Sequence, residues 1–342
     1  MFQRIFLTIK LYSQRHRRYS IWIVVVVPLL LYIINVARNT QPDPFDQPFC
    51  NPSDGVCHEK PNVASPRTVY SAWNKEQYDQ WWKYHEILNQ RAAEYAAKRT
   101  IYQANPHEEQ QKTRPLILLG DSITESWLGT GLGLPKHRAE GVPEVLNSQL
   151  SASQGFDPLV LAVSGDQTQH LLWRLQHGQL LSEYSNDPTA MFVVLIGTNN
   201  LGAGELPGPT ARGILAVVEY LLKNTSKESS LLIFEVLPRG DGKTWLQDLC
   251  PPRCQMSGLP YTSFLPPIQK TNQAVREGLE KLRKTYKASE SRLKLMDGGM
   301  EFLDSANPDL EVKESLMPDL LHPNAEGHKI LAKCIHQFRD HK

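Results

Sequence analysis

The sequence contains a serine, Ser122, and far along the chain an aspartate and a histidine, Asp319 and His322. An aspartate and a histidine together can activate a serine hydroxyl. Ser122 follows the aliphatic run 116–119 and a glycine turn, a pattern typical of a buried strand that leads into a helix. Such a turn exposes the hydroxyl above the sheet edge, near a helix N-terminus that favours negative charge. This position suits a nucleophile. The alternative is an ordinary turn in which Asp121 or Ser122 caps the helix.

Asp319 precedes His322 by three residues, just before the helical pattern 324–339. This spacing can place both side chains on the same side of one turn. The carboxylate then holds the orientation of the imidazole while the imidazole accepts the proton of the serine. The alternative is a surface loop in which Asn324 caps the following helix.

Two further loops carry hydrogen-bond donors that suit an oxyanion. Gly165 follows the apolar run 159–163, and Asn199 follows the run 191–196. A glycine allows the backbone geometry in which its N–H points at a ligand, and the asparagine amide supplies another donor. Together with the N–H of Ser122 they form the expected oxyanion hole. For each loop alone, ordinary turn chemistry is the alternative.

The elements that must position these residues alternate along the chain. Apolar runs at 116–119, 159–163, 191–196, 231–237 and 293–296 alternate with helical patterns at 169–181, 210–223, 264–286 and 324–339. This alternation predicts an α/β fold, a three-layer doubly wound (flavodoxin-like) sheet of five parallel strands with ligands at the carboxyl ends of the strands. Most of the polar motifs follow a predicted strand, so we expect all of them to meet at one edge of the sheet.

A helical segment precedes this domain. Residues 71–104 lack glycine and proline and predict one or two helices within the segment 68–112. The aromatic residues in it are candidates for packing rather than for catalysis, namely Trp73, Tyr78, Trp81, Trp82, Tyr84 and Tyr95.

Charge excludes one class of partner. The 342 residues carry 37 Lys and Arg against 36 Asp and Glu, and no basic stripe indicates nucleic-acid binding. The hydrophobic content of 41% is ample for a globular core.

The N-terminus predicts a membrane anchor. Residues 1–20 contain five basic and no acidic side chains, and residues 21–37 are almost wholly apolar. The charge distribution places tail 1–20 in the cytosol and makes residues 21–37 the transmembrane signal anchor of a single-pass type II protein. The catalytic domain would then be lumenal or extracellular, and the short span favours the Golgi or endoplasmic reticulum. The alternative is a cleaved signal peptide, but the small-x-small cleavage pattern is absent.

Residues 38–67 have the composition of a stem. Cys50 and Cys57 lie in it, and Cys250 and Cys254 lie in a second loop, so two short disulfides are expected in a lumenal compartment. A zinc site built from all four is the alternative. Cys334 lies on the apolar stripe of the last predicted helix, so we expect it in the core. Asn224 begins a glycosylation sequon.

The motifs as a set resemble a known family. Gly120-Asp121-Ser122, Gly165, Gly197-Thr198-Asn199 and Asp319-Leu320-Leu321-His322 match in order the four sequence blocks of the SGNH (GDSL) hydrolase superfamily. Within it the chain is most similar to the catalytic subunits of intracellular platelet-activating factor acetylhydrolase. The resemblance covers about residues 115–340, and it places the SGNH hydrolase domain at residues 113–342. It implies Ser122 as nucleophile, His322 as general base, Asp319 as its orienter, the oxyanion hole described above, and neither metal nor cofactor.

Three function classes follow. The leading one is a serine ester hydrolase that cleaves short acyl esters, acetyl esters first, of a lipid or a glycan. An O-acyltransferase using the same acyl-enzyme and a non-catalytic lumenal binding protein are the alternatives. The expected partners are the ester substrate and, through residues 21–37, the membrane, and a homodimer stays open. Insertions at 127–141 and 241–262 are expected to shape the rim of the pocket.

Overall fold

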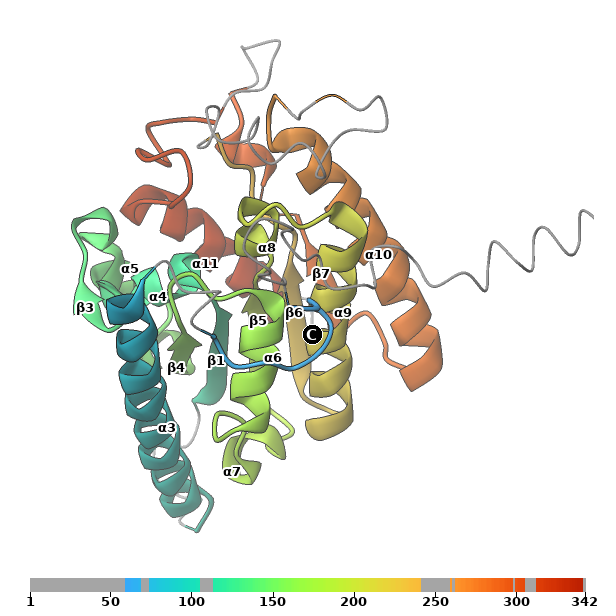
Figure 1. Cartoon of the computed structure of the whole chain (residues 1–342). Coiled ribbons are helices and arrows are strands. Elements are labelled where there is room, and N and C mark those ends of the chain that lie inside the picture. Colours follow the sequence, from blue (N-terminus) through green and yellow to red (C-terminus); the bar gives the residue numbers. More distant parts are fainter. Residues whose placement is uncertain are drawn as a thin grey trace, which may run out of the picture. The chain divides into compact units, whose positions relative to one another are not determined.

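The computed structural model describes residues 59–68, 74–104, 113–240, 259, 262–297, 299–304 and 312–340. Its main sheet has five parallel strands in the order β4-β1-β5-β6-β7 (Figure 1). The strands are β1 (Arg114–Gly120), β4 (Phe156–Ala162), β5 (Met191–Leu195), β6 (Ser230–Phe234) and β7 (Leu293–Met296). The predicted α/β fold with five parallel strands is therefore confirmed, and the strand order is the flavodoxin-like one.

Helices cover both faces of this sheet. One face packs against α3 (Lys75–Ala104), α6 (Thr168–Gln176), α9 (Pro207–Asn224) and α10 (Leu265–Tyr286), and the other against α5 (Val142–Gln149) and α11 (Ala325–Asp340). Alternate residues of β1 divide between the two cores, with Ile117 and Leu119 in the first and Leu116 and Leu118 in the second. A central strand buried on both faces needs the unbroken aliphatic sequence that β1 has.

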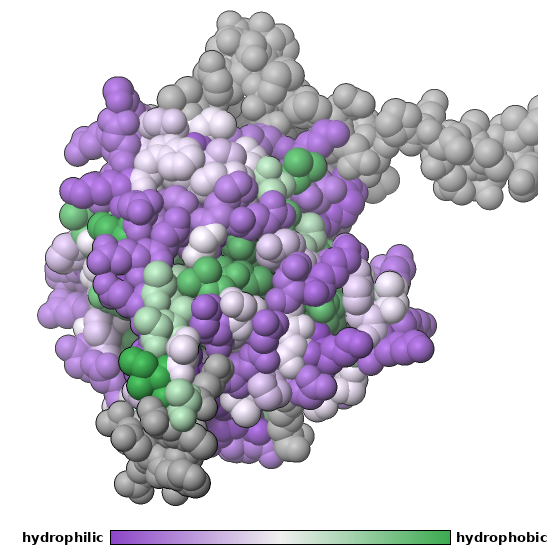
Figure 2. Space-filling model, turned by 90° about the horizontal axis from the view of Figure 1, so that it is seen from below, coloured by the Kyte–Doolittle hydropathy of each residue, from purple (hydrophilic) through white to green (hydrophobic). Residues whose placement is uncertain are grey.

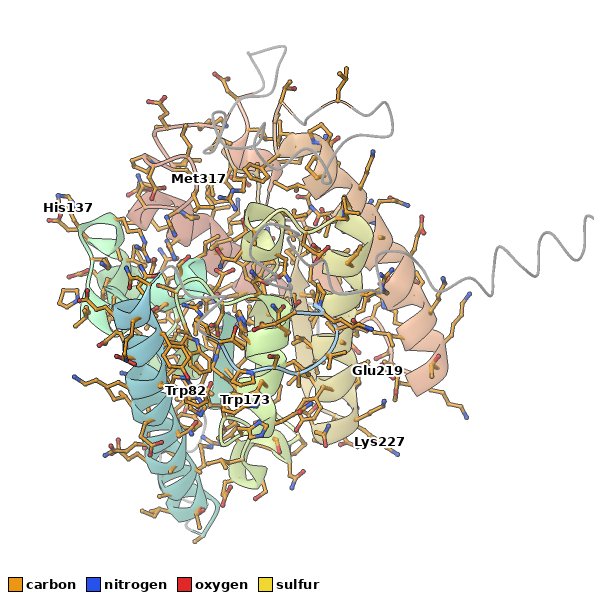
Figure 3. The ribbon with its side chains drawn as sticks, in the orientation of Figure 1. Trp82, His137, Trp173, Glu219, Lys227 and Met317 are labelled. Carbon is orange, nitrogen blue, oxygen red and sulfur yellow. The ribbon has the colours of Figure 1, made fainter. Side chains whose placement is uncertain are left out.

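The structure refines several expected elements. The segment predicted as one or two helices is the single helix α3, which buries Trp81, Tyr84 and Tyr95. Trp82 of α3 lies beside Trp173 of α6, with ring centroids 5.4 Å apart (Figure 3), whereas Trp73 lies outside the described residues. The helix expected at 169–181 ends earlier, as α6, because Gly178 takes a positive φ of 102° that breaks the helical path.

The sequence patterns did not predict several short elements, because these elements are too short to show a periodicity. They are α4 (Ser122–Glu125), α7 (Ser182–Ser185), α8 (Thr198–Gly202) and a two-stranded hairpin of β2 (Thr130–Gly131) and β3 (Leu134–Pro135).

The C-terminal part of the expected stem belongs to the folded unit. Pro61 O accepts a hydrogen bond from Thr168 Oγ1 at 2.8 Å, and Ser65 N donates to Gln169 O at 3.3 Å. The interpretation of 38–67 as a linker is therefore wrong for residues 59–67, since hydrogen bonds to α6 hold this segment against the domain.

Some expectations fall on residues that are not described. The predicted anchor 21–37, the cysteines Cys50, Cys57, Cys250 and Cys254, and most of the insertion 241–262 lie outside the described ranges. Within those ranges no helix has the length and apolar character needed to cross a bilayer. Cys334 is a buried free cysteine of α11, so its predicted place in the core is confirmed.

Figure 2 shows the underside of the view in Figure 1, where hydrophilic residues predominate and hydrophobic residues form only small patches. The large exposed hydrophobic side chains in the described part are few and include Ile87 and Ile101 of α3 and Leu134 of β3. Most of the large apolar side chains therefore lie in the two cores.

Candidate active site

Ser122 lies at the turn between β1 and α4, as the sequence predicts. The Asp121 side chain caps α4 by accepting a hydrogen bond from Ile123 N at 3.1 Å. Gly120 has no room for a Cβ, which would collide with the backbone oxygen of Leu195 and the side chain of Thr124. A glycine at this position therefore lets the turn lie close against β5 and directs Ser122 toward the carboxyl end of the sheet.

The expected aspartate and histidine meet this serine. Asp319 Oδ2 is 2.6 Å from His322 Nδ1, and His322 Nε2 is 2.9 Å from Ser122 Oγ. Asp319 Oδ1 accepts hydrogen bonds from the backbone N–H groups of Leu321 and His322, at 3.0 and 2.7 Å. The turn between the two side chains is tight, with Leu320 at a positive φ of 61°. The carboxylate thus holds both the ring and the backbone that carries it.

The ionisation state of Asp319 determines which ring nitrogen of His322 carries the proton. Burial alone raises the pKa of Asp319, but hydrogen bonds from the His322 side chain and backbone outweigh it and hold that pKa at about 2. An ionised carboxylate can only accept, so His322 Nδ1 carries the proton that it donates to Asp319. Nε2 is then left with a lone pair, which can accept the hydroxyl proton of Ser122.

Gly165 and Asn199 line the same pocket as Ser122 and His322. Gly165 takes a positive φ of 81° in the loop after β4, and Asn199 lies in the first turn of α8. One N–H of the Asn199 amide donates to Asp166 O at 2.9 Å, which fixes the side chain and leaves its second N–H for a ligand. The structure therefore brings together every residue that the sequence analysis proposed for catalysis or for the oxyanion hole.

Sequence reasoning missed Glu125, a fully buried carboxylate in α4. Its oxygens accept hydrogen bonds from Thr130 Oγ1 (2.9 Å), Leu132 N (3.0 Å) and Gly133 N (2.8 Å) of the hairpin. They also accept from the N and Oγ of Ser164, at 2.7 and 2.6 Å. Glu125 therefore ties the β2–β3 hairpin to the loop that carries Gly165. Its only sequence signal is its place between the apolar residues Ile123 and Trp127.

Asp166 was also missed as an organising residue. Its carboxylate accepts from Trp81 Nε1 and Arg174 Nε, both at 2.7 Å, and from Arg67 Nη2 at 3.3 Å. Arg174 in turn donates to Gly120 O at 3.2 Å, beside the candidate nucleophile. Helices α3 and α6 and the segment 59–68 are thereby fixed to the two loops of the site.

Asp121 is the strongly shifted acid of the site. Burial raises its pKa to about 7, against a hydrogen bond from Ile123 N that lowers it. Its second oxygen, Oδ2, is buried and has no partner among the described residues. Asp121 is thus held partly protonated near neutral pH, in contrast to the ionised Asp319.

The pocket in front of Ser122 has a volume of about 260 Å³. Its lining consists of Arg67, Gln77, Ser122, Gly131, Leu132, Lys136, Arg138, Ser164, Gly165, Asn199, Leu321 and His322. Four of these residues come from the insertion 127–141, which was expected at the rim. In the described part of the chain, no three His, Cys, Asp or Glu side chains are grouped so that they could hold a metal ion.

The chain is similar in sequence to known proteins. A model of the GDSL-like Lipase/Acylhydrolase family matches residues 118–330. The platelet-activating factor acetylhydrolase IB subunit alpha1 of Pongo abelii is 27% identical over 233 residues, 68% of this chain and 78% of that relative. The alpha2 subunit of Rattus norvegicus is 28% identical over 188 residues, 54% of this chain and 66% of the relative, slightly less than two thirds of its length.

Solved structures are similar at lower identity. A GDSL-like lipase from Bacteroides thetaiotaomicron superposes with a TM-score of 0.45 at 16% identity, over 72% of this chain and 100% of that one. An acetylxylan esterase from Geobacillus stearothermophilus superposes with a TM-score of 0.40 at 14% identity, over 66% of this chain and 93% of that one.

Proposed function

The chain belongs to the GDSL-like lipase/acylhydrolase family and is a carboxylic ester hydrolase, and from this premise we propose that it cleaves short acyl esters through Ser122. One observation carries the proposal: the hydrogen-bonded row Asp319–His322–Ser122 lies beside Gly165 and Asn199 in one pocket.

The reaction follows from this row. Ser122 Oγ attacks the ester carbonyl while His322 Nε2 takes its proton, and Asp319 stabilises the imidazolium that forms. The N–H groups of Ser122, Gly165 and the Asn199 amide donate to the oxyanion. When the tetrahedral intermediate collapses, the C–O bond to the alcohol breaks and His322 returns the proton to the leaving oxygen. Water then attacks the acyl-enzyme by the same route and releases the carboxylic acid.

Pocket size favours a short acyl group, acetyl first. The volume of about 260 Å³ lies below the range of roughly 300–1,000 Å³ that is usual for pockets enclosing drug-sized ligands. An ester of a lipid or a glycan would place its small acyl group here and its larger alcohol portion toward the rim.

We expect the full-length protein in detergent to hydrolyse 4-nitrophenyl acetate with a kcat/KM about tenfold or more above that for the octanoate, because an oversized acyl chain clashes in a small pocket. Release of nitrophenol from the acetate, butyrate and octanoate measures this, with a neutral sugar added in parallel to reveal any transfer of the acyl group. A higher kcat/KM for the octanoate would contradict the proposed acyl preference, and an acylated sugar would point to the transferase.

For location, we propose a type II protein anchored through residues 21–37 with the catalytic domain in the Golgi or endoplasmic reticulum lumen. The charge distribution of the first 38 residues supports this, and the sequon residue Asn224 is exposed at the end of α9. We expect the C-terminal domain to be protected from protease in intact microsomes, and an endoglycosidase to shift the wild-type protein but not Asn224→Gln. Digestion of the domain from the cytosolic side would contradict this topology.

A further inference from the structure

The pocket in front of Ser122 is lined by three cationic side chains, Arg67, Lys136 and Arg138, and by no carboxylate. Arg67 is compensated, because its guanidinium forms an ion pair with the buried Asp166 at 3.3 Å. The charges of Lys136 and Arg138 form no ion pair within the part of the chain that the structure describes. The side of the pocket formed by residues 131–138 therefore presents the charges of Lys136 and Arg138, while the carboxylates of Glu125, Asp319 and Asp121, outside the lining, lie close enough to interact with Arg138.

Arg138 is poorly satisfied for a half-buried guanidinium. Its Nη2 donates to Ser164 Oγ at 3.2 Å, while its Nε is buried without a partner among the described residues. The nearby carboxylate of Glu125 is already occupied by hydrogen bonds from the hairpin and from Ser164. A guanidinium has five N–H donors, so most of those of Arg138 remain for a ligand.

The segment 136–138, which directly follows the hairpin, directs its cations to one side. Lys136 and Arg138 line the pocket, whereas His137 between them is 95% exposed in its side chain and projects away from the body of the protein (Figure 3). Backbone contacts hold this arrangement, since Lys136 N donates to Gly129 O at 3.0 Å and Glu125 fixes Leu132 and Gly133. These backbone contacts thus hold the charges of Lys136 and Arg138 beside the candidate nucleophile.

Resting on the proposed function, we propose that Lys136 and Arg138 bind an anionic group, a carboxylate or a phosphate, that the ester substrate carries close to its scissile bond. The planar fork of the arginine matches both oxyanions, and the lysine adds a second charge at the rim. The substrate class is therefore an acyl ester of an acidic alcohol, such as an acidic sugar or a phosphorylated glycerol. The structural alternative is that Arg138 only holds the Ser164 loop, which would affect all esters equally.

Two matched pairs of acetyl esters test this in the full-length protein. One pair is O-acetylglycolate and its neutral methyl ester, and the other is an acetyl ester of glycerol 3-phosphate and the same ester of glycerol. We expect kcat/KM for at least one anionic member to exceed that of its neutral partner by about tenfold to a hundredfold, mainly through KM. The pair with the larger ratio identifies carboxylate or phosphate as the source of the charge.

The variants separate recognition from loop structure. Arg138→Ala is expected to bring the anionic-to-neutral ratio close to one, Arg138→Lys to restore part of it, and the exposed Lys136→Ala to lower it without disturbing the fold. His137→Ala, between the two cations in sequence, is the control and should keep the wild-type ratio. A wild-type ratio near one in both pairs, or an Arg138→Ala variant that loses activity on both members equally, would overturn the proposal.

A binding measurement keeps this test independent of catalysis. In Ser122→Ala protein, calorimetry with glucuronate and with inorganic phosphate should detect binding of at least one, weakened about tenfold or more by Arg138→Ala and by added salt. If no ester were hydrolysed but this binding were found, the proposed function would fail and the anion site would stand. If the wild-type protein hydrolysed neutral esters but neither anion bound to the Ser122→Ala protein, the anion site alone would fail.

Discussion

Ser122→Ala is expected to abolish ester hydrolysis, with kcat lowered on the order of 10⁶-fold. The variant removes the oxygen that lies 2.9 Å from His322 Nε2, and no other described serine shares that position. His322→Ala should be about as damaging, because a serine hydroxyl is a weak nucleophile until a base takes its proton. The double variant should lose little more, since members of one triad act as a unit.

Initial rates with 4-nitrophenyl acetate measure the loss, and a serine-directed phosphonate identifies the nucleophile by mass spectrometry of the labelled peptide. Ser182→Ala, an exposed serine of α7, serves as the matched control and should retain wild-type rates and labelling. The mechanism is wrong if Ser122→Ala remains active, or if the phosphonate labels a peptide that lacks Ser122.

Much of the fold was predictable because the sheet is buried on both faces. Each of the five strands overlaps an apolar run of the sequence, and such runs have few other stable places in a protein of this size. Parallel strands then bring the loops after β1, β4 and β5 to one edge, so a turn serine, a glycine and an asparagine far apart in sequence could be expected to meet. Only their distances needed the structure.

The supporting residues could not be predicted in the same way. Glu125 acts through Ser164, 39 positions away, and Asp166 acts through Arg67, 99 positions away. The local periodicity of the sequence does not reveal these distant hydrogen-bond partners, because a buried carboxylate is compatible with any fold that brings donors to it. The hairpin was missed for a related reason: positive φ angles at Gly129, Leu132 and Gly133 define its path, and such angles leave no repeating pattern.

Asp166→Asn is expected to lower the free energy of unfolding by about 3–5 kcal/mol. The carboxylate of Asp166 is fully buried and compensates two guanidinium groups, those of Arg174 (0% exposed) and Arg67 (3% exposed). Asparagine preserves the shape and one acceptor oxygen, but it removes the carboxylate charge that both buried guanidinium groups contact. The loss of that charge, rather than the lost hydrogen bond, sets the size of the effect.

Urea unfolding monitored by tryptophan fluorescence measures this change, because Trp81 also donates to Asp166. Asp79→Asn is the matched control: the same chemical change in α3 removes an exposed pair with Lys75, for which the unfolding midpoint should stay within error. Since Asp166 directly follows Gly165 and its backbone oxygen holds Asn199, the folded variant should also lose kcat while Asp79→Asn retains it. Equal stability of the two variants would show that the buried ion pairs of Asp166 do not anchor the oxyanion loop.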